Sequence, residues 1–390
     1  MKDKCKIIFT GDIGFSRYMH DKWKDENLLS SEILSFFNDT DHVVANVEGP
    51  LYKGEDVGNR GVFFHPMEPD VSNFLEKINV DVYSIANNHI MDVGIEGLLS
   101  TIDIAKKKRC RTIGAGINEE KASEPIYFDE AGGIGMFAVA YMSECVPADE
   151  NSPGVFRWDN MSAIEETIKK IKKDHRWCIM VVHGGEEFAD LPNPYTRNRY
   201  LEYLRMGADI VVGHHPHVVE NYELFDNKAI FYSLGNFIFD TDYQRVHPYT
   251  DKGVLLELEL DEKSFIFNAM AIKIDRQKEI IYEADLPVIF TDISEKDYQL
   301  LSPLSSKMFL EEEKKRMAFL EPEKFANASD REFVEYFNSD NIEGYDKGSH
   351  MDLSLVVENA GKADNNDYLL SDKKDVIDYI LRDNKLKDYD

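Results

Sequence analysis

Seven short apolar runs are spread over the first two thirds of the chain, and six of them end in a cluster of polar residues. The runs are rich in β-branched residues and have the length of buried strands. Segments with helical spacing separate them, and this alternation is typical of an α/β fold, in which ligands bind at the carboxyl ends of the strands. The runs cover residues 6–10, 42–45, 80–85, 134–140, 178–182, 209–212 and 229–233.

The segments between and after these runs complete the expected domain. Residues 95–108 and 161–173 have helical apolar spacing, and the second segment ends in four lysines, the charge favoured at a helix C-terminus. Residues 254–274 alternate apolar and polar side chains, which predicts late antiparallel strands that close the sheet. We therefore predict one α/β domain over residues 1–288.

The last hundred residues have a different character. Residues 291–390 contain 24 acidic and 14 basic residues, and helical patterning is evident at 294–320 and 330–337. We predict an acidic, mainly helical C-terminal extension over residues 289–390. A solvated surface layer on the same domain explains this composition equally well.

Charge and composition exclude several classes of partner. The formal net charge of −28 disfavours nucleic acid and anionic lipid surfaces, because both require a clustered basic face. The four cysteines are scattered singly, which predicts reduced thiols in a cytoplasmic protein, and no apolar stretch is long enough to span a membrane. An anionic substrate would need bound metal cations to attract it.

The run Gly-His-His-Pro-His at 213–217 is the sharpest local signal. Three histidines within four positions after an apolar strand cannot all be satisfied core residues. His215 and His217 alternate, so they can face the same side of an extended segment, as paired metal ligands require. His183 also ends an apolar run and is followed by two glycines, which let the backbone approach a ligand closely.

The other polar clusters are weak evidence when each is taken alone. A Gly-Asp pair such as the one ending at Asp12 is more often a turn than a ligand. Asn46 and Glu48 are equally suited to capping a turn, and the Asn88-His89 pair to capping the helix expected near residue 94. Their order along the chain is what makes the set informative.

Taken in order, the clusters resemble the CapA family of capsule and poly-γ-glutamate synthesis proteins. The resemblance covers about residues 5–245 and implies the calcineurin-like metallophosphoesterase fold, a four-layer α/β/β/α sandwich with the site at one edge. The matching motifs are F-T-G-D at 9–12, N-V-E-G-P-L at 46–51, S-I-A-N-N-H-I-M-D-V-G at 84–94, H-G-G-E-E-F at 183–188, G-H-H-P-H-V at 213–218 and Y-S-L-G-N-F-I-F-D at 232–240.

The resemblance implies a role for each matched position. Glu48, with Asn46 beside it, stands where the wider superfamily has a bridging aspartate, and His89 is the implied proton donor or oxyanion stabiliser. The implied metal ligands are Asp12, Asn46, Glu48, Asn88, His183, His215 and His217. Because none of the motifs lies beyond residue 240, we expect the C-terminal extension to be dispensable for metal binding.

Two departures from the superfamily pattern affect the expected site. The usual Asp-x-His after the first strand is Asp12-Ile13-Gly14 here, so one metal loses a histidine ligand. The usual His-Trp-Gly is His183-Gly184-Gly185 here, so a large aromatic side chain is missing from the expected wall of the site. Carboxylate and imidazole ligands together suit Mn, Fe or Zn, and the pattern is compatible with one or two divalent ions.

These features lead to a metal-dependent hydrolase that uses a metal-activated water on a phosphoester or a γ-glutamyl amide, with an anionic small molecule or polymer as substrate. Besides His89, Glu187 is placed to orient water or bind a substrate amine, and Arg17 to clamp a carboxylate or phosphate. A surface arginine is an equally good interpretation of Arg17. The alternative function is a non-catalytic component that binds metal and polymer in a biosynthetic assembly.

Overall fold

The computed structural model of the chain describes residues 2–54, 64–141, 145–320, 322–325 and 353–363, together with residues 327, 329 and 332. It contains two large sheets with helices packed against them, which confirms the predicted α/β class. Residues 330–337, where a helix is expected, lie outside the described residues apart from Glu332.

The larger sheet has eight strands in the order β16-β15-β14-β1-β2-β3-β4, and β13 also pairs with β1. Strands β13, β1, β2, β3 and β4 are parallel, whereas β14, β15 and β16 form the antiparallel addition that the alternation at 254–274 predicts. The strands are β1 (Lys4–Gly14), β2 (His42–Val47), β3 (Val82–Ser84), β4 (Arg111–Ile113), β13 (Asn236–Phe239), β14 (Lys252–Asp261), β15 (Phe265–Asp275) and β16 (Ile280–Ala284).

The second sheet has six strands in the order β11-β12-β10-β9-β7-β6. Its central strands β12, β10, β9 and β7 are parallel, and each edge strand is antiparallel to its neighbour. These strands are β6 (Ile126–Phe128), β7 (Ile134–Ala140), β9 (Trp177–His183), β10 (Ile210–His214), β11 (Tyr222–Phe225) and β12 (Lys228–Phe231), and a separate pair joins β5 (Ala115–Gly116) to β8 (Gly154–Val155).

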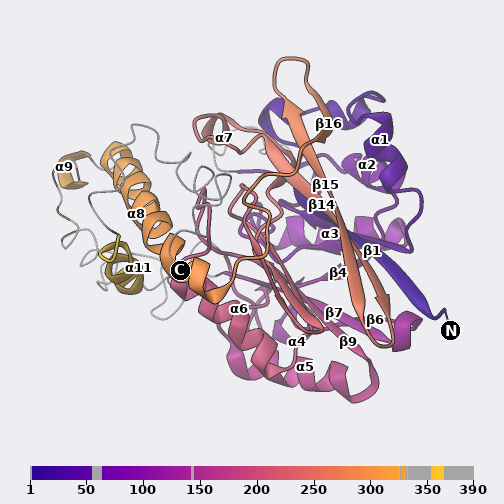
Figure 1. Cartoon of the computed structure of the whole chain (residues 1–390). Helices are drawn as coiled ribbons and strands as arrows, with labels where there is room; N and C mark the ends of the chain where they lie inside the picture. The colour runs from indigo at the N-terminus through magenta and orange to yellow at the C-terminus, as the bar shows by residue number, and fades with distance from the viewer. Residues whose placement is uncertain are drawn as a thin grey trace.

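Helices cover the sheets from different sides. Helix α5 packs along β7 and β9, and α6 packs on β10 and β12 of the same sheet, whereas α1 and α2 lie beyond β15 and β16 in Figure 1. The longer helices are α1 (Ser31–Phe36), α2 (Val71–Lys77), α3 (Ile95–Lys107), α5 (Met161–Asp174), α6 (Pro194–Met206), α8 (Glu295–Leu320) and α11 (Leu353–Ala360). The short ones are η1 (Arg17–Met19), η2 (Lys22–Lys24), α4 (Glu119–Ala122), η4 (Glu130–Gly132), α7 (Asp242–Arg245) and α9 (Pro322–Phe325).

Helix α5 shows why these segments fold as the pattern predicts. Its buried residues Ile164, Thr167, Ile168 and Ile171 recur at helical spacing, so one face packs against β7 and β9. The side chain of Asn160 caps the first turn by accepting from the amide of Ala163, and lysines occupy the last turn. The predicted helix over 161–173 is confirmed.

The register of the parallel strands gathers the polar clusters. Asp12 pairs with Asn46 across β1 and β2, and His214 pairs with His183 across β10 and β9. His214 Nε2 lies 2.8 Å from the carbonyl oxygen of Thr10, so the carboxyl ends of β1 and β10 meet although they belong to different sheets. A site at this junction therefore draws side chains from both sheets.

Helix α8 begins inside the main hydrophobic core. Tyr298, Leu301, Leu304 and Met308 are buried in the same cluster as the strands of both sheets. Figure 1 shows α8, α9 and α11 together at one end of the molecule. Among the described residues, no helix is long and apolar enough to cross a membrane, and all four cysteines are free, as their spacing predicts.

Candidate metal centre

Glu48 lies at the centre of the polar clusters that end the strands. It directly follows β2, and its side chain is completely buried. Its Oε1 atom lies 3.5 Å from His217 Nε2, 3.8 Å from His183 Nε2 and 4.0 Å from His89 Nε2. Neither carboxylate oxygen accepts a hydrogen bond from any described residue. A buried carboxylate without donors is costly, so this arrangement favours a cation as its partner.

Strand β1 places Asp12 beside Asn46, at a point where the pairing with β2 shifts. Asn46 Nδ2 donates to Asp12 Oδ1 at 2.8 Å, and His217 Nδ1 lies 3.2 Å from Asp12 Oδ2. Burial raises the pKa of Asp12, but the contacts with His217, His214 and Asn46 together outweigh burial and hold the pKa below its ordinary value. Asp12 is therefore ionised at neutral pH, as a metal ligand must be.

The three histidines at the carboxyl end of β10 point in different directions. His214 is turned toward the carbonyl of Thr10 and away from the centre. His215 and His217 have backbone φ angles of 99° and 59°, in the left-handed region that residues other than glycine seldom adopt. Strain of this kind concentrates at functional sites, where the surrounding structure enforces it. The structure thus brings His215 and His217 together, as the alternation predicts, and separates His214 from them.

The imidazole of His217 is oriented by Asn236 at the start of β13. His217 Nδ1 donates to Asn236 Oδ1 at 2.9 Å. Asn236 Nδ2 donates to Gln244 Oε1 at 3.1 Å and to the carbonyl of Thr250 at 2.9 Å, which fixes the amide oxygen toward the ring. Because Nδ1 is used in this bond, Nε2 is the ring nitrogen left to bind a metal.

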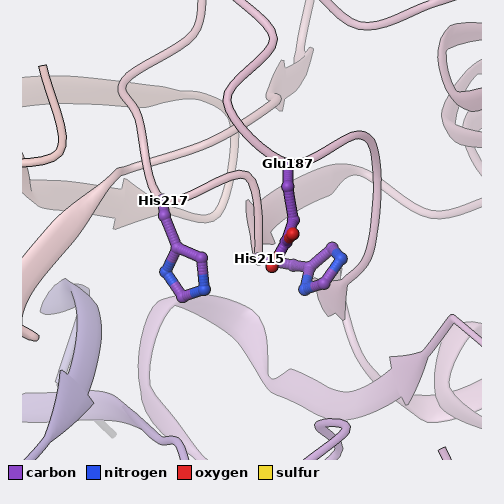
Figure 2. A group of neighbouring side chains, drawn as sticks. All are labelled: Glu187, His215 and His217. Carbon is purple, nitrogen blue, oxygen red and sulfur yellow. The ribbon is translucent and has the colours of Figure 1, made fainter. Parts of the chain in front are cut away.

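Two groups of three side chains have the spacing of metal ligands. In each group the three ligand atoms lie within 4.8 Å of one another. Figure 2 shows the group formed by Glu187, from the loop after β9, with His215 and His217, and the three side chains point into the same space. Glu187, which the sequence suggests for orienting water or an amine, is therefore placed among the candidate ligands. The other group is Asp12, Glu48 and His183.

Asn88 and His89 follow β3 and lie next to His183 and Glu48, respectively. Asn88 Oδ1 lies 2.9 Å from His183 Nε2, as expected of two ligands of one ion. His89 Nδ1 lies 3.2 Å from Asp92 Oδ2, and its ring is 13% exposed where the neighbouring ligands are almost completely buried. His89 thus lies at the accessible edge of the site with its Nε2 facing Glu48.

Arg17 lies outside both ligand groups. It is exposed at the start of η1, and its positive charge contributes to lowering the pKa of the nearby buried His65. This position is next to the site and not in it. A substrate-binding role for Arg17 stays a prediction.

Two aromatic side chains from other segments fill the space beside Gly184. A Cβ atom at this glycine would lie 2.7 Å from the Cβ of Tyr141 and 3.0 Å from the ring of Trp158. The Tyr141 ring centre is 6.4 Å from that of His215. The space beside Gly184 is therefore already filled by residues distant in sequence.

Comparison with known proteins identifies the family. Residues 6–241, more than half of the chain, match the family described as bacterial capsule synthesis protein PGA_cap. This chain belongs to the PGA_cap family. The family is part of the metallophosphoesterase-like superfamily, so the resemblance seen in the motifs is confirmed.

Relatives of this PGA_cap chain include proteins named for capsule synthesis. It is 30% identical over 250 residues to the PGA biosynthesis protein CapA of Bacillus subtilis, a match that covers 62% of this chain and 65% of that protein. It is 25% identical over 340 residues to the capsule biosynthesis protein CapA of Bacillus anthracis, covering 80% and 81% of the two chains. A probable polyglutamine synthesis accessory protein of Mycobacterium tuberculosis is 24% identical over 213 residues, or 52% of this chain and 56% of the relative. The chain thus spans just under two thirds of the Bacillus subtilis protein.

The donor set of this PGA_cap chain fits a divalent metal. Carboxylate oxygens and imidazole nitrogens suit Mn, Fe or Zn. Both oxygens of Glu48 and the amide oxygen of Asn46 are buried without a hydrogen-bond donor among the described residues. A cation would satisfy these oxygens, and Asp12, Glu48 and His183 form a group that could hold one.

Three supporting residues were not predicted from the sequence. Asp92 orients His89 and also accepts from the backbone amide of His65 at 2.7 Å. The ring of His65 lies edge-on to that of His89, with the ring centres 4.4 Å apart, and its Nδ1 is 2.7 Å from Ser16 Oγ. Asp92 and Asn236 lie inside the motifs at 84–94 and 232–240, which could have suggested them. No signal in the sequence marks His65.

We expect metal binding to strengthen as pH rises from 6 to 8. Burial lowers the pKa of His217, but Glu48 and Asp12 raise it more strongly, to about 10, so the metal-free imidazole carries a proton at neutral pH. A metal must displace that proton, and affinity should increase up to about tenfold per pH unit for each proton released. Calorimetric titration with Zn²⁺ in buffers of different ionisation enthalpy measures the release. An affinity that does not change with pH would contradict this assignment.

Proposed function

We propose that the chain is a metal-dependent hydrolase of the metallophosphoesterase type that acts in capsule or poly-γ-glutamate synthesis. One observation carries the proposal: a completely buried carboxylate, Glu48, faces three imidazoles at 3.5–4.0 Å and accepts no hydrogen bond within the part of the chain that the structure describes. Such a cluster is costly unless a cation binds there. The capsule context comes from the family description and from the names of the Bacillus relatives.

The proposal includes the four-layer α/β/β/α arrangement of this superfamily. Helices α5 and α6 pack on the six-stranded sheet, and α1 and α3 contact the eight-stranded one. The sheets touch each other through β1 and β10 and through β4 and β7. These contacts are the ones that a sheet-on-sheet sandwich with outer helices requires.

When bound, a divalent ion at this site lowers the pKa of water and neutralises negative charge on the substrate. The chain's own residues supply orientation and proton transfer. Asp92 holds Nδ1 of His89, and Nε2 faces the centre, 3.2 Å from Asn88 Nδ2. In its protonated form the ring can hand the Nε2 proton to a leaving group. The partial exposure of His89 gives a substrate access to it.

Arginines lie near the site but are paired with a carboxylate. Phe239 packs its ring against His65 and His217, and the next residue, Asp240, binds both Arg245 and Arg276. Because this pairing offsets their charge and the chain has a net charge of −28, a bound metal ion is the main attraction for an anionic substrate. A phosphoester and a γ-linked glutamate polymer both carry the negative charge that such an ion attracts.

A substrate panel tests the proposed activity. We expect the purified chain, loaded with Mn²⁺, to hydrolyse either an aryl phosphate or γ-linked glutamate oligomers, and to lose that turnover when a chelator is added. Turnover of the phosphate identifies a phosphoesterase, and release of glutamate identifies an amidase. Asp12→Asn serves as the inactive control. Metal binding without turnover of either substrate would contradict the hydrolase.

The second candidate is a non-catalytic component that binds metal and polymer. It is favoured by the sequence Ile13-Gly14, which leaves the first strand without its usual histidine ligand. The Mycobacterium relative, moreover, is named a probable accessory protein. Equilibrium binding of γ-linked oligomers to the metal-loaded chain, with no product formed over hours, would support this function.

A further inference from the structure

The position of Glu187 depends on a short loop with unusual backbone geometry. Residues 184–193 connect β9 to α6. Phe188 has a φ angle of 60°, and its amide donates to the carbonyl of Pro216 at 2.8 Å, which ties this loop to the histidine loop after β10. The Phe188 ring stacks on His247 with the ring centres 3.8 Å apart. Small shifts of this loop would move the Glu187 carboxylate relative to His215 and His217.

The residue before Glu187 anchors the loop on its inner side. Glu186 is 1% exposed and points away from the metal groups. Its Oε1 accepts from Thr196 Oγ1 at 2.7 Å, and its Oε2 accepts from the amide of Asn193 at 3.1 Å. These two bonds fasten the loop to the first turn of α6, which has no side-chain cap from Asn193 itself.

Side chains of helix α8 hold the C-terminal end of the same loop at three consecutive loop residues, 191–193. Ser305 Oγ accepts from the amide of Leu191 at 3.3 Å and lies 3.2 Å from its carbonyl oxygen. Tyr298 OH donates to the carbonyl of Pro192 at 2.8 Å, and Ser306 Oγ donates to Asn193 Oδ1. All three side chains of α8 are almost completely buried. Each contact is polar and directional, which fixes a position more tightly than apolar packing does.

Helix α11 supports α8 from behind. Asn359 Nδ2 donates to Ser306 Oγ at 3.0 Å and to Ser302 Oγ at 3.2 Å. At the start of α8, Glu295 binds Arg197 of α6, whose guanidinium also forms a bidentate pair with Glu223. The segment after residue 288 is therefore joined by polar contacts to residues 191–193, at the end of the loop that carries Glu187, and to Arg197 in the helix that follows it.

We infer that α8 and α11, which lie outside the residues matched by the family, position Glu187 for a metal ion. Tyr298, Ser305 and Ser306 are positioning residues: they act through the loop at 191–193, and none is a ligand. The inference rests on the proposed metal centre. It replaces the expectation, based on where the motifs lie, that residues beyond 288 are dispensable for metal binding.

The test is a metal titration of the full chain carrying Ser305→Ala and Ser306→Ala. Calorimetry with Zn²⁺ on chelator-treated protein should show that binding at the Glu187, His215 and His217 group weakens about 10–100-fold, as is typical when an outer partner of a ligand is lost. Binding at the Asp12, Glu48 and His183 group should be unchanged. In a Glu187→Gln background the serine substitutions should cause no further loss, because they act through that carboxylate.

A matched variant separates positioning from a general loss of stability. Thr167→Ala removes a buried hydroxyl whose bond lies within α5, outside the contacts that support the loop. It should lower the unfolding temperature without changing metal affinity. If the double variant does not fold, Tyr298→Phe can be used, since it removes only the hydroxyl. It should also weaken metal binding at the Glu187, His215 and His217 group, but by a smaller factor.

The outcomes distinguish this inference from the proposed function. Equal weakening at both ligand groups, unchanged affinity, or a further loss in the Glu187→Gln background would overturn the positioning role. Absence of metal binding by the unaltered chain would overturn the metal centre itself, and the inference with it.

Discussion

Glu48→Gln should remove the stabilisation that a metal ion at the Asp12, Glu48 and His183 group gives the protein, while leaving the metal-free protein almost as stable as before. Burial raises the pKa of Glu48, which shows that the charged carboxylate is unfavourable there without a cation, and glutamine has the same shape. A ligand at a thousand times its dissociation constant stabilises a folded protein by about 4 kcal/mol. Thermal unfolding with and without Mn²⁺ should show a clearly smaller gain for the variant than for the unaltered chain.

A glutamate elsewhere provides the control for that experiment. Glu257 lies in β14 and is partly buried, and it belongs to neither ligand group. Glu257→Gln should keep the full metal-dependent gain. If Glu48→Gln retains that gain, Glu48 is not a ligand. If it instead unfolds the metal-free protein, the carboxylate serves the structure of the apo chain.

His89→Asn should leave metal content nearly unchanged and slow turnover by about 10²–10⁴-fold, the range typical of losing a general acid or base. The structure supports this separation because His89 belongs to neither group of ligand atoms and its Nδ1 is held by Asp92. Metal analysis and steady-state kinetics on the same preparation measure both quantities. Asp92→Asn should lower turnover in the same direction, since it releases the ring.

His215→Asn is the matched comparison, because it removes an imidazole that lies within a ligand group. It should lower metal content directly. Should His89→Asn strip metal as thoroughly as His215→Asn does, His89 is a ligand and the proton-donor role fails. If His89→Asn changes neither metal content nor turnover, the non-catalytic function gains support.

Much of the fold could be predicted because local patterns decide it. The strands at 134–140 and 178–182 are short apolar runs that become fully buried β7 and β9, and the lysine-ended segment at 161–173 becomes α5. Parallel strands in register then bring their carboxyl ends together without further information, which is why Asp12 meets Asn46 and His183 meets His214.

The rest depends on contacts that sequence spacing does not encode. His65 reaches His89 from a segment with no motif, and Trp158 fills the space beside Gly184 from a different part of the chain. The position of Glu187 among the candidate ligands was also not predictable, because only the loop geometry decides which of two adjacent glutamates faces the histidines. Localisation in the cytoplasm and the domain boundary at residue 288 stay predictions.

Because the candidate ligands come from both sheets, metal binding would also affect how the two sheets hold together. Asp12 and Glu48 come from the eight-stranded sheet, whereas His183, Glu187, His215 and His217 come from the six-stranded sheet and its loops. A metal ion bound by both sets, as proposed above, would link the two sheets. Gly114 lies where the sheets meet, and even a Cβ there would contact Ala86, two residues before Asn88, and Ala138 of the other sheet. We expect Gly114→Val to push the sheets apart and so to weaken metal binding.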